Sequence, residues 1–322
     1  MKPWGPAIFL LLTAAGLGGF FAARSLATKP EQRVDAELAQ TPHAVSATKD
    51  QVPFNAPLAS QQRSALGLYP LFIGSSRDIA IRAMTSTVNL PAYVAIPQIA
   101  QAFFRRPYNA FSLDNTRQEE LRIDLTSFDC FLFVEQLIAL VNSHDISGFV
   151  KTVRDLRYEE GRVNYCSRYH YFTHWADNAI SKGLMLNLAG SLPQAVNRSI
   201  RLDYMSSHGS AYAPMRLKSN SDCIVKKESS LVANQAFVPI DSLLAVENQI
   251  RSGDVFALVT GVQGLDVTHV GFLLKEPKRL SAIHAAPGRG VMISPDFVSY
   301  ASSVPEVIGV AIYRPLTQNL NP

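Results

Sequence analysis

The sequence lacks any block of lysine or arginine. Its 30 Lys and Arg residues stand against 26 Asp and Glu residues, so the net charge is only +4 at pH 7. Nucleic-acid-binding domains concentrate positive charge in a patch or stripe, and the sequence therefore predicts no nucleic-acid partner. A mildly basic surface suits an acidic polymer such as a cell wall. The sequence also has no internal repeat with a period of roughly 20–50 residues, which excludes a solenoid.

Long hydrophobic runs are absent except at the N-terminus. Lys2 precedes an apolar run at 7–23, and two small residues follow at 25 and 27, which is the order found in a secretory signal. The run of about 17 residues is shorter than the roughly 20 that span a bilayer. We expect 1–27 to be a signal peptide cleaved after Ala27, with an uncleaved membrane anchor, and hence a membrane tether, as the alternative. Both predict an exported protein, either periplasmic or held at the outer face of the inner membrane.

Cysteine is scarce, and the three that are present are Cys130, Cys166 and Cys223. An odd number in an exported protein leaves at least one free thiol or an intermolecular disulfide. We hypothesise that Cys166 pairs with Cys223. Cys130 is then the thiol that remains for chemistry.

Several prolines lie at 28–60 among small and polar residues without sustained periodicity, which is typical of a flexible linker. Apolar clusters then recur without a second linker, so 61–318 is expected to be a single domain. Helical patterns come first and strand-like segments with short, turn-rich connections fill the last third. This order predicts an α+β fold with an antiparallel C-terminal meander. The expected helices are 96–104 (opening at Pro97), 128–141, 146–156 and 169–182 (closed by Gly183), with 158–165 extended; the expected strands are 254–260, 268–275, 280–285, 290–294 and 307–314.

The helix expected from Phe128 onward carries the first candidate for catalysis. Apolar residues from 134 onward recur at helical spacing, and Ser127 or Asp129 is placed to cap the N-terminus. Cys130 then lies in the first turn, where free backbone N–H groups and the helix dipole favour an anion. Its thiol is therefore expected to ionise below the usual pKa of roughly 8.5, which suits a nucleophile. A small buried hydrophobic residue is the alternative for Cys130.

Two histidines are expected to lie side by side on neighbouring strands. If 276–279 forms the turn between the second and third strands, Gly271 faces His284. His269 and His284 are then diagonal neighbours on one face, with Cβ atoms roughly 7–8 Å apart. With Cys130 they form a nucleophile, a base and a residue that orients the base. A half-buried strand residue without a catalytic role is the alternative for each histidine.

A second histidine pair does not predict a metal site. His170 and His174 lie four residues apart, but the intervening Tyr-Phe-Thr lacks the Glu that a zinc protease uses as its base. His170, Tyr171 and Trp175 are expected to line a pocket or to pack in the core. Arg168 is placed to bind a substrate carboxylate bidentately, with a surface charge as the alternative.

Two motifs are specific enough to indicate a family: Ser-Arg-x-His-Tyr at 167–171 and Gly-Leu-Asp-x-Thr-His-Val-Gly at 264–271. Together with weaker ones, they resemble the exported N-acetylmuramoyl-L-alanine amidases of the NlpC-like, papain-fold cysteine hydrolase superfamily. The resemblance covers roughly 100–315. The weaker motifs lie, in chain order, at 104–108, 125–130, 133–135, 157–158, 252–254, 283–285, 308–309 and 314–315. The chain departs from the pattern at 285–287, where Ala-Ala-Pro stands and a Ser after the first Ala is expected.

This resemblance implies a papain-like, NlpC-like fold in which the nucleophile helix packs on the antiparallel sheet. It implies hydrolysis of the amide between N-acetylmuramic acid and L-alanine in peptidoglycan or a muropeptide, without a cofactor. Cys130 is the implied nucleophile, His269 the base and His284 the orienting residue. The implied substrate-binding residues are Asp129, Tyr108, Arg168, His170, Tyr171 and Asp266.

Three other functions fit parts of the pattern. One is a D,L-endopeptidase that cuts within the stem peptide, and the second is a non-catalytic wall-binding module of the same fold. A zinc amidase is the third. Acyltransferases with a permuted version of this fold place His before Cys, whereas here Cys130 precedes His269.

Overall fold

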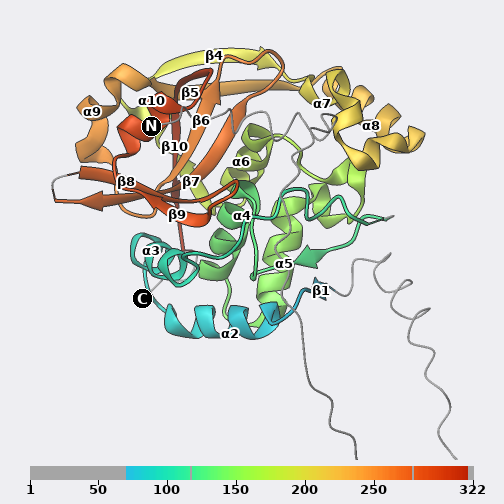
Figure 1. The fold of residues 1–322 in the computed structure, drawn as a ribbon, viewed down its shortest axis with the longest axis horizontal. Coiled ribbons are helices and arrows are strands. Elements are labelled where there is room, and N and C mark those ends of the chain that lie inside the picture. Colours follow the sequence, from blue (N-terminus) through green and yellow to red (C-terminus); the bar gives the residue numbers. More distant parts are fainter. Residues whose placement is uncertain (1–69, 117, 278, 318–322) are drawn as a thin grey trace, which may run out of the picture.

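The protein folds as helices packed against one large antiparallel sheet (Figure 1). The computed structural model describes residues 70–116, 118–277 and 279–317. The expected signal or anchor at 1–27 and linker at 28–60 lie outside this part, as do 61–69 of the expected domain. No helix in the described part is long and apolar enough to cross a membrane. The expected α+β class is confirmed.

Eight strands form the sheet in the order β4-β5-β10-β6-β7-β8-β9, and β3 pairs with β10. The expected meander is confirmed for β6 to β9, and all five C-terminal strands lie within one residue of their predicted bounds. The last strand, β10, differs from a simple meander because it returns to pair with β5 and β6. The strand bounds are β3 (Met185–Asn187), β4 (Val196–Arg201), β5 (Val232–Pro239), β6 (Val255–Thr260), β7 (Val267–Glu276), β8 (Arg279–Ala286), β9 (Gly290–Ser294) and β10 (Val307–Pro315).

The longer helices agree with the sequence patterns except at their starts. One helix begins at Ala92, earlier than expected, and Pro97 lies inside it; Pro91 is its N-cap. Another begins at Phe172 and not at 169, and Gly183 follows it with a φ of 71°, as expected for a C-cap. The main helices are α2 (Ser76–Ser86), α3 (Ala92–Ala102), α4 (Cys130–Val141), α5 (Ile146–Arg157), α6 (Phe172–Ser181), α8 (Lys218–Glu228) and α10 (Phe297–Ser303), with short turns α7 (Tyr204–Ser207) and α9 (Leu243–Val246).

The segment 158–165 is not extended as expected. Short 3-10 turns occupy 159–161 and 165–167, and Glu160 adopts a φ of 53°. Glu160 and Gly161 therefore form a tight turn in this segment. It leads into a further tight turn, however, and not into a strand.

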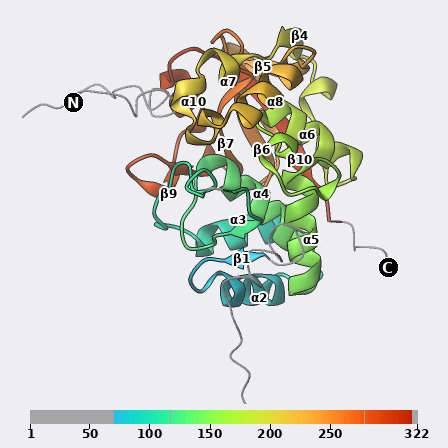
Figure 2. The ribbon, with the colours of Figure 1, turned by 90° about the vertical axis from the view of Figure 1, so that its right-hand side faces the viewer.

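Helix α4 lies at the centre of the larger core cluster, against β7 and β8 and between α3 and α5 (Figures 1 and 2). Residues 132–140 of this helix are all buried, which explains why its sequence, apart from Glu135 and Gln136, is apolar all round and not only along one stripe. A second core cluster joins the sheet to α9 and α10. Helices thus cover the sheet, and α4 packs directly against β7.

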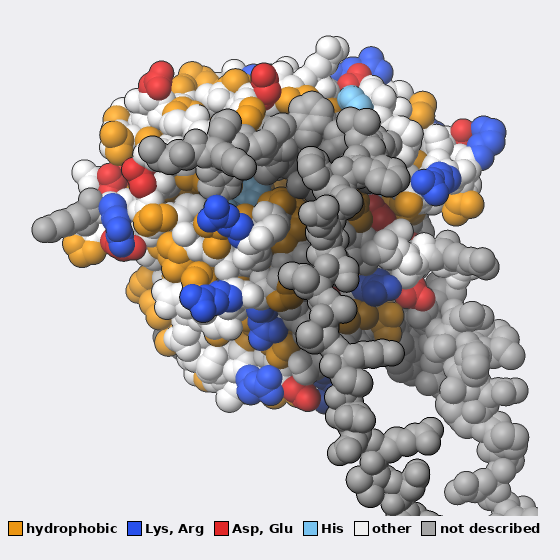
Figure 3. All heavy atoms as spheres, viewed as in Figure 1, with side chains coloured by type: hydrophobic (Ala, Val, Ile, Leu, Met, Phe, Trp, Pro, Cys, Tyr) orange, Lys and Arg blue, Asp and Glu red, His pale blue; other side chains and the backbone are white. Residues whose placement is uncertain are grey.

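Charges of both signs are distributed among hydrophobic side chains on the face that Figure 3 presents. Acidic and basic side chains also pair directly, as in the contacts of Lys151 with Asp155 and of Lys275 with Glu247. On the described residues of this face, the basic side chains are therefore spread out, as the composition indicated.

Candidate active site

Helix α4 begins at Cys130, and Asp129 is its N-cap. The Asp129 carboxylate accepts a hydrogen bond from the backbone N–H of Leu132 at 2.7 Å. Asp129 is therefore the cap, while the other candidate, Ser127, donates to Asp124. The sequence places an ionisable carboxyl and a thiol next to each other at the positive end of a buried helix.

The expectation of a readily ionised thiol is wrong for this pocket. The pKa of Cys130 is raised to about 12, mainly by burial and also by the neighbouring charge of Asp129. Hydrogen bonds from the backbone of Val270, Cys130 and Phe131 oppose this change but are outweighed. Cys130 is therefore a neutral thiol at neutral pH, because the loss of hydration raises its pKa more than the hydrogen bonds at the helix terminus lower it.

The carboxyl of Asp129 is perturbed in the same direction. Burial raises its pKa to about 6, while the N–H of Leu132 and the positive charge of Arg157 lower it. Arg157 itself is held by Glu135 in an ion pair of 2.6 Å, with both side chains almost fully buried. The start of α4 thus lies beside a buried ion pair in which Glu135 raises the pKa of Asp129 and Arg157 lowers it.

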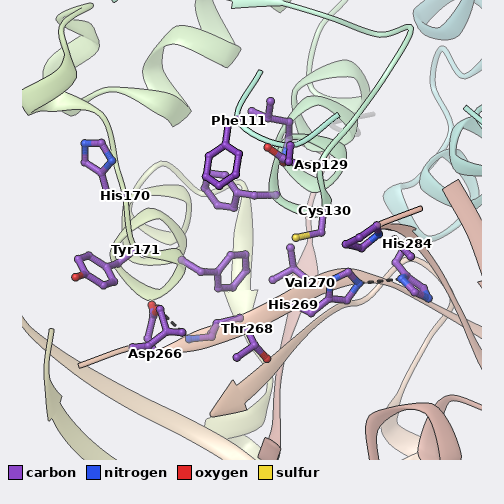
Figure 4. A pocket seen from close by; sticks show the side chains of 18 of the residues that line it. Phe111, Asp129, Cys130, His170, Tyr171, Asp266, Thr268, His269, Val270 and His284 are labelled. Atoms are coloured by element: carbon purple, nitrogen blue, oxygen red, sulfur yellow. Dashed lines mark hydrogen bonds between the residues drawn. The ribbon is translucent and has the colours of Figure 1, made fainter. Parts of the chain in front are cut away.

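The histidine pair predicted from the strand register is present. Lys275 pairs with Leu280 and Phe272 with Ile283, as the counted hairpin requires. The ring nitrogens His269 Nε2 and His284 Nδ1 lie 2.8 Å apart (Figure 4). Gly271 contributes to this contact because a Cβ there would lie only 2.6 Å from Cβ of His284.

The chain of contacts continues beyond the two histidines to a serine. His284 Nε2 lies 2.9 Å from Ser294 Oγ, and both residues are buried. Ser294 lies on β9, two residues after Met292, which faces His284 across the ladder. The prediction from the sequence ended at His284, although the same counting of alternate strand positions places Ser294 on that face.

Two aromatic rings border the histidines. Phe256 has ring-centroid distances of 6.0 Å to His269 and 6.1 Å to His284. Tyr300 of α10 lies 4.7 Å from the His284 ring at a tilt of 32° and 6.1 Å from the His269 ring. This dry environment lowers the pKa of His269 to about 4 by burial, and it lowers that of His284 as well.

A cavity of about 310 Å³ joins these groups. Figure 4 shows the Cys130 sulfur pointing into it, with His269 and His284 on one side and His170, Tyr171 and Asp266 on the other. All nine residues assigned to catalysis or substrate binding from the sequence line this cavity; the six expected to bind substrate are Tyr108, Asp129, Arg168, His170, Tyr171 and Asp266.

Arg168 is buried and paired within the chain. Its guanidinium contacts the carboxylates of Asp114 and Glu119, and these charges raise its pKa above the ordinary value despite burial. The contact with Asp114 fixes the loop that follows Tyr108 and borders the cavity. The alternative of a surface charge is therefore wrong, and the free bidentate face expected for a substrate carboxylate is already occupied by this chain.

Three other cavity residues also make internal hydrogen bonds. Asp266 accepts from the backbone N–H of Thr173 at 2.7 Å and so caps α6 from outside that helix. The Tyr171 hydroxyl donates to Glu228 at 2.5 Å, which ties α6 to α8. His170 Nε2 donates to the carbonyl of Tyr165 at 2.8 Å, which leaves Nδ1 as the acceptor nitrogen of a neutral ring.

A disulfide fastens the part of the chain that covers one end of the cavity. Cys166 and Cys223 are bonded, as hypothesised, and Cys130 is free. The bond joins the turn before Arg168 to α8. The segment between the two cysteines includes residues 184–222, which the sequence left unassigned and which supply Tyr204 and other cavity-lining residues.

Among the described residues, no group of three or more His, Cys, Asp or Glu side chains is placed to hold a metal ion. His170 Nε2 is hydrogen-bonded to a backbone carbonyl, and His174 makes an edge contact with the Tyr169 ring at 4.8 Å. The arrangement instead offers a thiol, a hydrogen-bonded imidazole pair and helix N–H groups, which are the parts needed for acyl transfer through sulfur.

A protein-family comparison matches residues 98–309 to the family described as AmiA-like, N-acetylmuramoyl-L-alanine amidase-like. The chain belongs to this family. Membership in this amidase-like family indicates a hydrolase acting on peptidoglycan. No curated protein matches the chain.

Solved structures resemble this AmiA-like chain over most of its described length. An N-acetylmuramoyl-L-alanine amidase from Bacteroides uniformis ATCC 8492 is 25% identical, with 69% of this chain and 99% of that chain covered and a TM-score of 0.65. A protein from Bacteroides fragilis named as a putative xylanase is 26% identical, covers 67% and 98% of the two chains and has a TM-score of 0.62. A Legionella pneumophila protein, at 20% identity and a TM-score of 0.62, covers 75% and 95% and shares the fold.

Proposed function

We propose that the protein is a cysteine amidase of the NlpC-like, papain-fold superfamily that hydrolyses the amide between N-acetylmuramic acid and L-alanine. The observation that carries the proposal is that the hydrogen-bonded His269–His284 pair and the Cys130 thiol border the same cavity. Membership in an amidase-like family supplies the bond class. The similar protein from Bacteroides uniformis is named for the same activity.

The reaction begins with a neutral thiol and a neutral imidazole. His269 takes the Cys130 proton as the sulfur attacks the carbonyl carbon on the muramic acid side of the amide. The tetrahedral intermediate then collapses, the carbon–nitrogen bond breaks, and His269 returns the proton to the alanine nitrogen. The peptide leaves as an amine, and a thioester to Cys130 remains.

Water completes the cycle. His269 removes a proton from water, which attacks the thioester carbonyl, and the carboxylic acid of the sugar is released as the Cys130 thiol is restored. The backbone N–H groups at the start of α4 are the donors nearest to the oxyanion of each tetrahedral intermediate. His284 holds the His269 ring through its hydrogen bond, so His284 is a positioning residue.

The other cavity residues divide by whether their polar groups are already used. We assign substrate contact to Tyr108, to Oδ2 of Asp129, which is the carboxyl oxygen that does not cap α4, and to the free Nδ1 of His170. Arg168 and Asp266 have internal partners and position the cavity wall. The remaining member, Tyr171, has a hydroxyl bound to Glu228, so only its ring is offered to substrate.

The proposal includes export, since peptidoglycan lies outside the cytoplasm. The N-terminal segment 1–27, with its charged start and apolar run, is the proposed secretory signal. Fractionation of expressing cells, with N-terminal sequencing of the product, checks this. A cytoplasmic full-length product contradicts export, and a membrane-bound full-length product favours the anchor.

Digestion of purified muropeptides followed by mass spectrometry tests the activity. We expect a disaccharide with a free muramic acid carboxylate and a stem peptide with a free L-alanine amine, and we expect Cys130→Ala to release neither. Ser303→Ala, at an exposed position on the cavity rim, is the matched control and should retain activity. A sugar product that still carries L-alanyl-D-glutamate favours the endopeptidase instead, and chelator inhibition without sensitivity to alkylation favours a zinc amidase.

A further inference from the structure

The loop between α3 and the short strand β2 (Arg122–Ile123) forms one wall of the cavity. Phe111 lies in this loop, and Figure 4 shows it in the cavity wall close to Asp129, on the side of Cys130 away from His284. Leu113 and Asp114 of the same loop also line the cavity. An aromatic side chain is therefore held in the cavity wall beside the start of α4.

The backbone of Phe111 is strained. Its φ is 56°, in the left-handed region that an aromatic L-residue rarely adopts and that glycine adopts freely. Four other described non-glycine residues have a positive φ, namely Asn89, Arg105, Glu160 and Glu306. Phe111 differs from these four because it lines the cavity. Strain of this kind persists only where the surrounding structure enforces it, and it is concentrated at functional sites.

The loop is fastened on both sides of Phe111. Before it, the N–H of Asn109 donates to the carbonyl of Phe128, next to the N-cap of the nucleophile helix, at 2.9 Å. After it, the N–H of Asp114 donates to the Phe111 carbonyl at 2.9 Å. The Asp114 carboxylate is in turn held by the buried Arg168. These contacts fix the Phe111 backbone from both sides.

Packing of the Phe111 ring does not offset the cost of this backbone strain in the folded protein. Phe111 is only half-buried, and it belongs to none of the three core clusters of the described residues. It also forms no aromatic pair among them, whereas Phe131 stacks edge-on with Phe172 and Trp175. A core role therefore explains Phe131 but not Phe111.

We infer that Phe111 is a specificity-determining residue whose ring contacts an apolar part of the bound muropeptide beside the scissile amide. The inference rests on the proposed amidase function, because it requires substrate to pass Cys130. The strain at Phe111 is then offset when substrate binds, and Arg168 acts through Asp114 to keep the ring in place. Substitutions at Phe111 should therefore change stability and substrate affinity independently.

A set of three variants separates the ring from the backbone. Phe111→Gly removes the strain and the ring together, and Phe111→Ala removes the ring but keeps the strain. For both we expect KM for the muropeptide to rise at least about fivefold with kcat within about threefold of wild type, which is the signature of lost binding. Phe111→Tyr should keep KM within about twofold because the ring remains.

Thermal unfolding of the same proteins gives a readout that does not depend on activity. We expect Phe111→Gly to unfold at a higher temperature than Phe111→Ala, by about 2 °C. Asn89→Gly, at an exposed left-handed position outside the cavity, is the control and should leave KM unchanged.

The inference is overturned if Phe111→Ala hydrolyses the muropeptide with the KM of the wild type. It is also overturned if Phe111→Gly is less stable than Phe111→Ala. Failure of the proposed function looks different, because the wild-type enzyme itself then releases no disaccharide, and in that case both proposals fall together.

Discussion

The Nε2 atom of His269 lies 2.8 Å from Nδ1 of His284, and Nε2 of His284 lies 2.9 Å from Ser294 Oγ. For His269 to accept a proton from Cys130 at Nδ1, its Nε2 must carry hydrogen and donate to His284. His284 must then carry its own proton on Nε2 and donate to Ser294. The Ser294 hydroxyl at the far end of this relay accepts the His284 proton when His269 has the tautomer that its proposed role as base requires.

The relay predicts graded losses of activity. We expect His284→Ala to lower kcat about 10²- to 10³-fold, since the ring of the base loses its partner. Ser294→Ala should lower kcat by about tenfold, because His284 keeps its place but loses the acceptor that fixes its proton. Muropeptide kinetics measure both, with the exposed Ser302→Ala on α10 as the control. Equal activity of Ser294→Ala and wild type would remove Ser294 from the relay.

The pH dependence follows from the dry surroundings of the thiol and the base. His269 has a pKa of about 4, so it is neutral and able to accept a proton at pH values above 4. The acid limb of kcat/KM should therefore fall near pH 4. Asp129, whose pKa is about 6, gives a limb nearer 6 if its ionisation is required, and Asp129→Asn would remove that limb.

Alkylation of the free enzyme tests the protonation state of the thiol directly. Since burial raises the pKa of Cys130 to about 12, its reaction with iodoacetamide should be slow at pH 7 and should still be accelerating above pH 9. Intact-mass spectrometry follows the modification, and Cys130→Ala should show none. A plateau in the rate below pH 8 would instead mean that a thiolate–imidazolium pair exists before substrate binds.

Tyr300 is expected to act through its ring. The centroid of the Tyr300 ring lies 4.7 Å from that of His284, and the Phe256 ring borders the same histidine at 6.1 Å. Tyr300→Phe keeps the ring, so we expect kcat within about threefold of wild type. Tyr300→Leu removes one of the two aromatic rings that border the histidines, so kcat should fall at least about tenfold. The acid limb of the pH profile should shift upward as water reaches His269.

Comparable losses in Tyr300→Phe and Tyr300→Leu would point to the hydroxyl, whose pKa is raised by burial and by the nearby Cys130 charge. Tyr93→Phe and Tyr93→Leu provide the matched control, because Tyr93 is exposed on α3 and outside the cavity. Neither change at Tyr93 should alter the kinetics.

The sequence predicted the strand bounds and the histidine pair because both depend on a simple count. A hairpin turn with an even number of residues, together with the two-residue period of a strand, places His269 and His284 on one face of the sheet. This count does not depend on the rest of the fold. Helix α4, which carries Cys130, was predictable for a similar reason, since its apolar pattern and its cap lie within a few adjacent residues. Local rules therefore recovered the elements that carry the proposed chemistry.

Features that depend on long-range contacts were not predictable. The thiol pKa is set by water exclusion in the assembled cavity, so the helix terminus alone gave the wrong direction. Arg168 looked free because its partners, Asp114 and Glu119, lie about 50 residues earlier in a loop without periodicity. The strand β4 was missed because its side chains are mostly exposed and carry no hydrophobic alternation.

The disulfide should contribute to stability through the segment it closes. Cys166 and Cys223 are separated by 57 positions, and a loop of that length corresponds to about 4 kcal/mol of lost entropy in the unfolded chain. We expect the double variant Cys166→Ser, Cys223→Ser to lose about 2–4 kcal/mol of unfolding free energy. Denaturant titration without reductant measures this, and reductant should destabilise the wild type by the same amount while leaving the double variant unchanged. If reductant had no effect on wild-type unfolding, the bond would not be formed in solution. The control is Cys130→Ser, which should respond to reductant as the wild type does, because the Cys130 thiol takes no part in the disulfide.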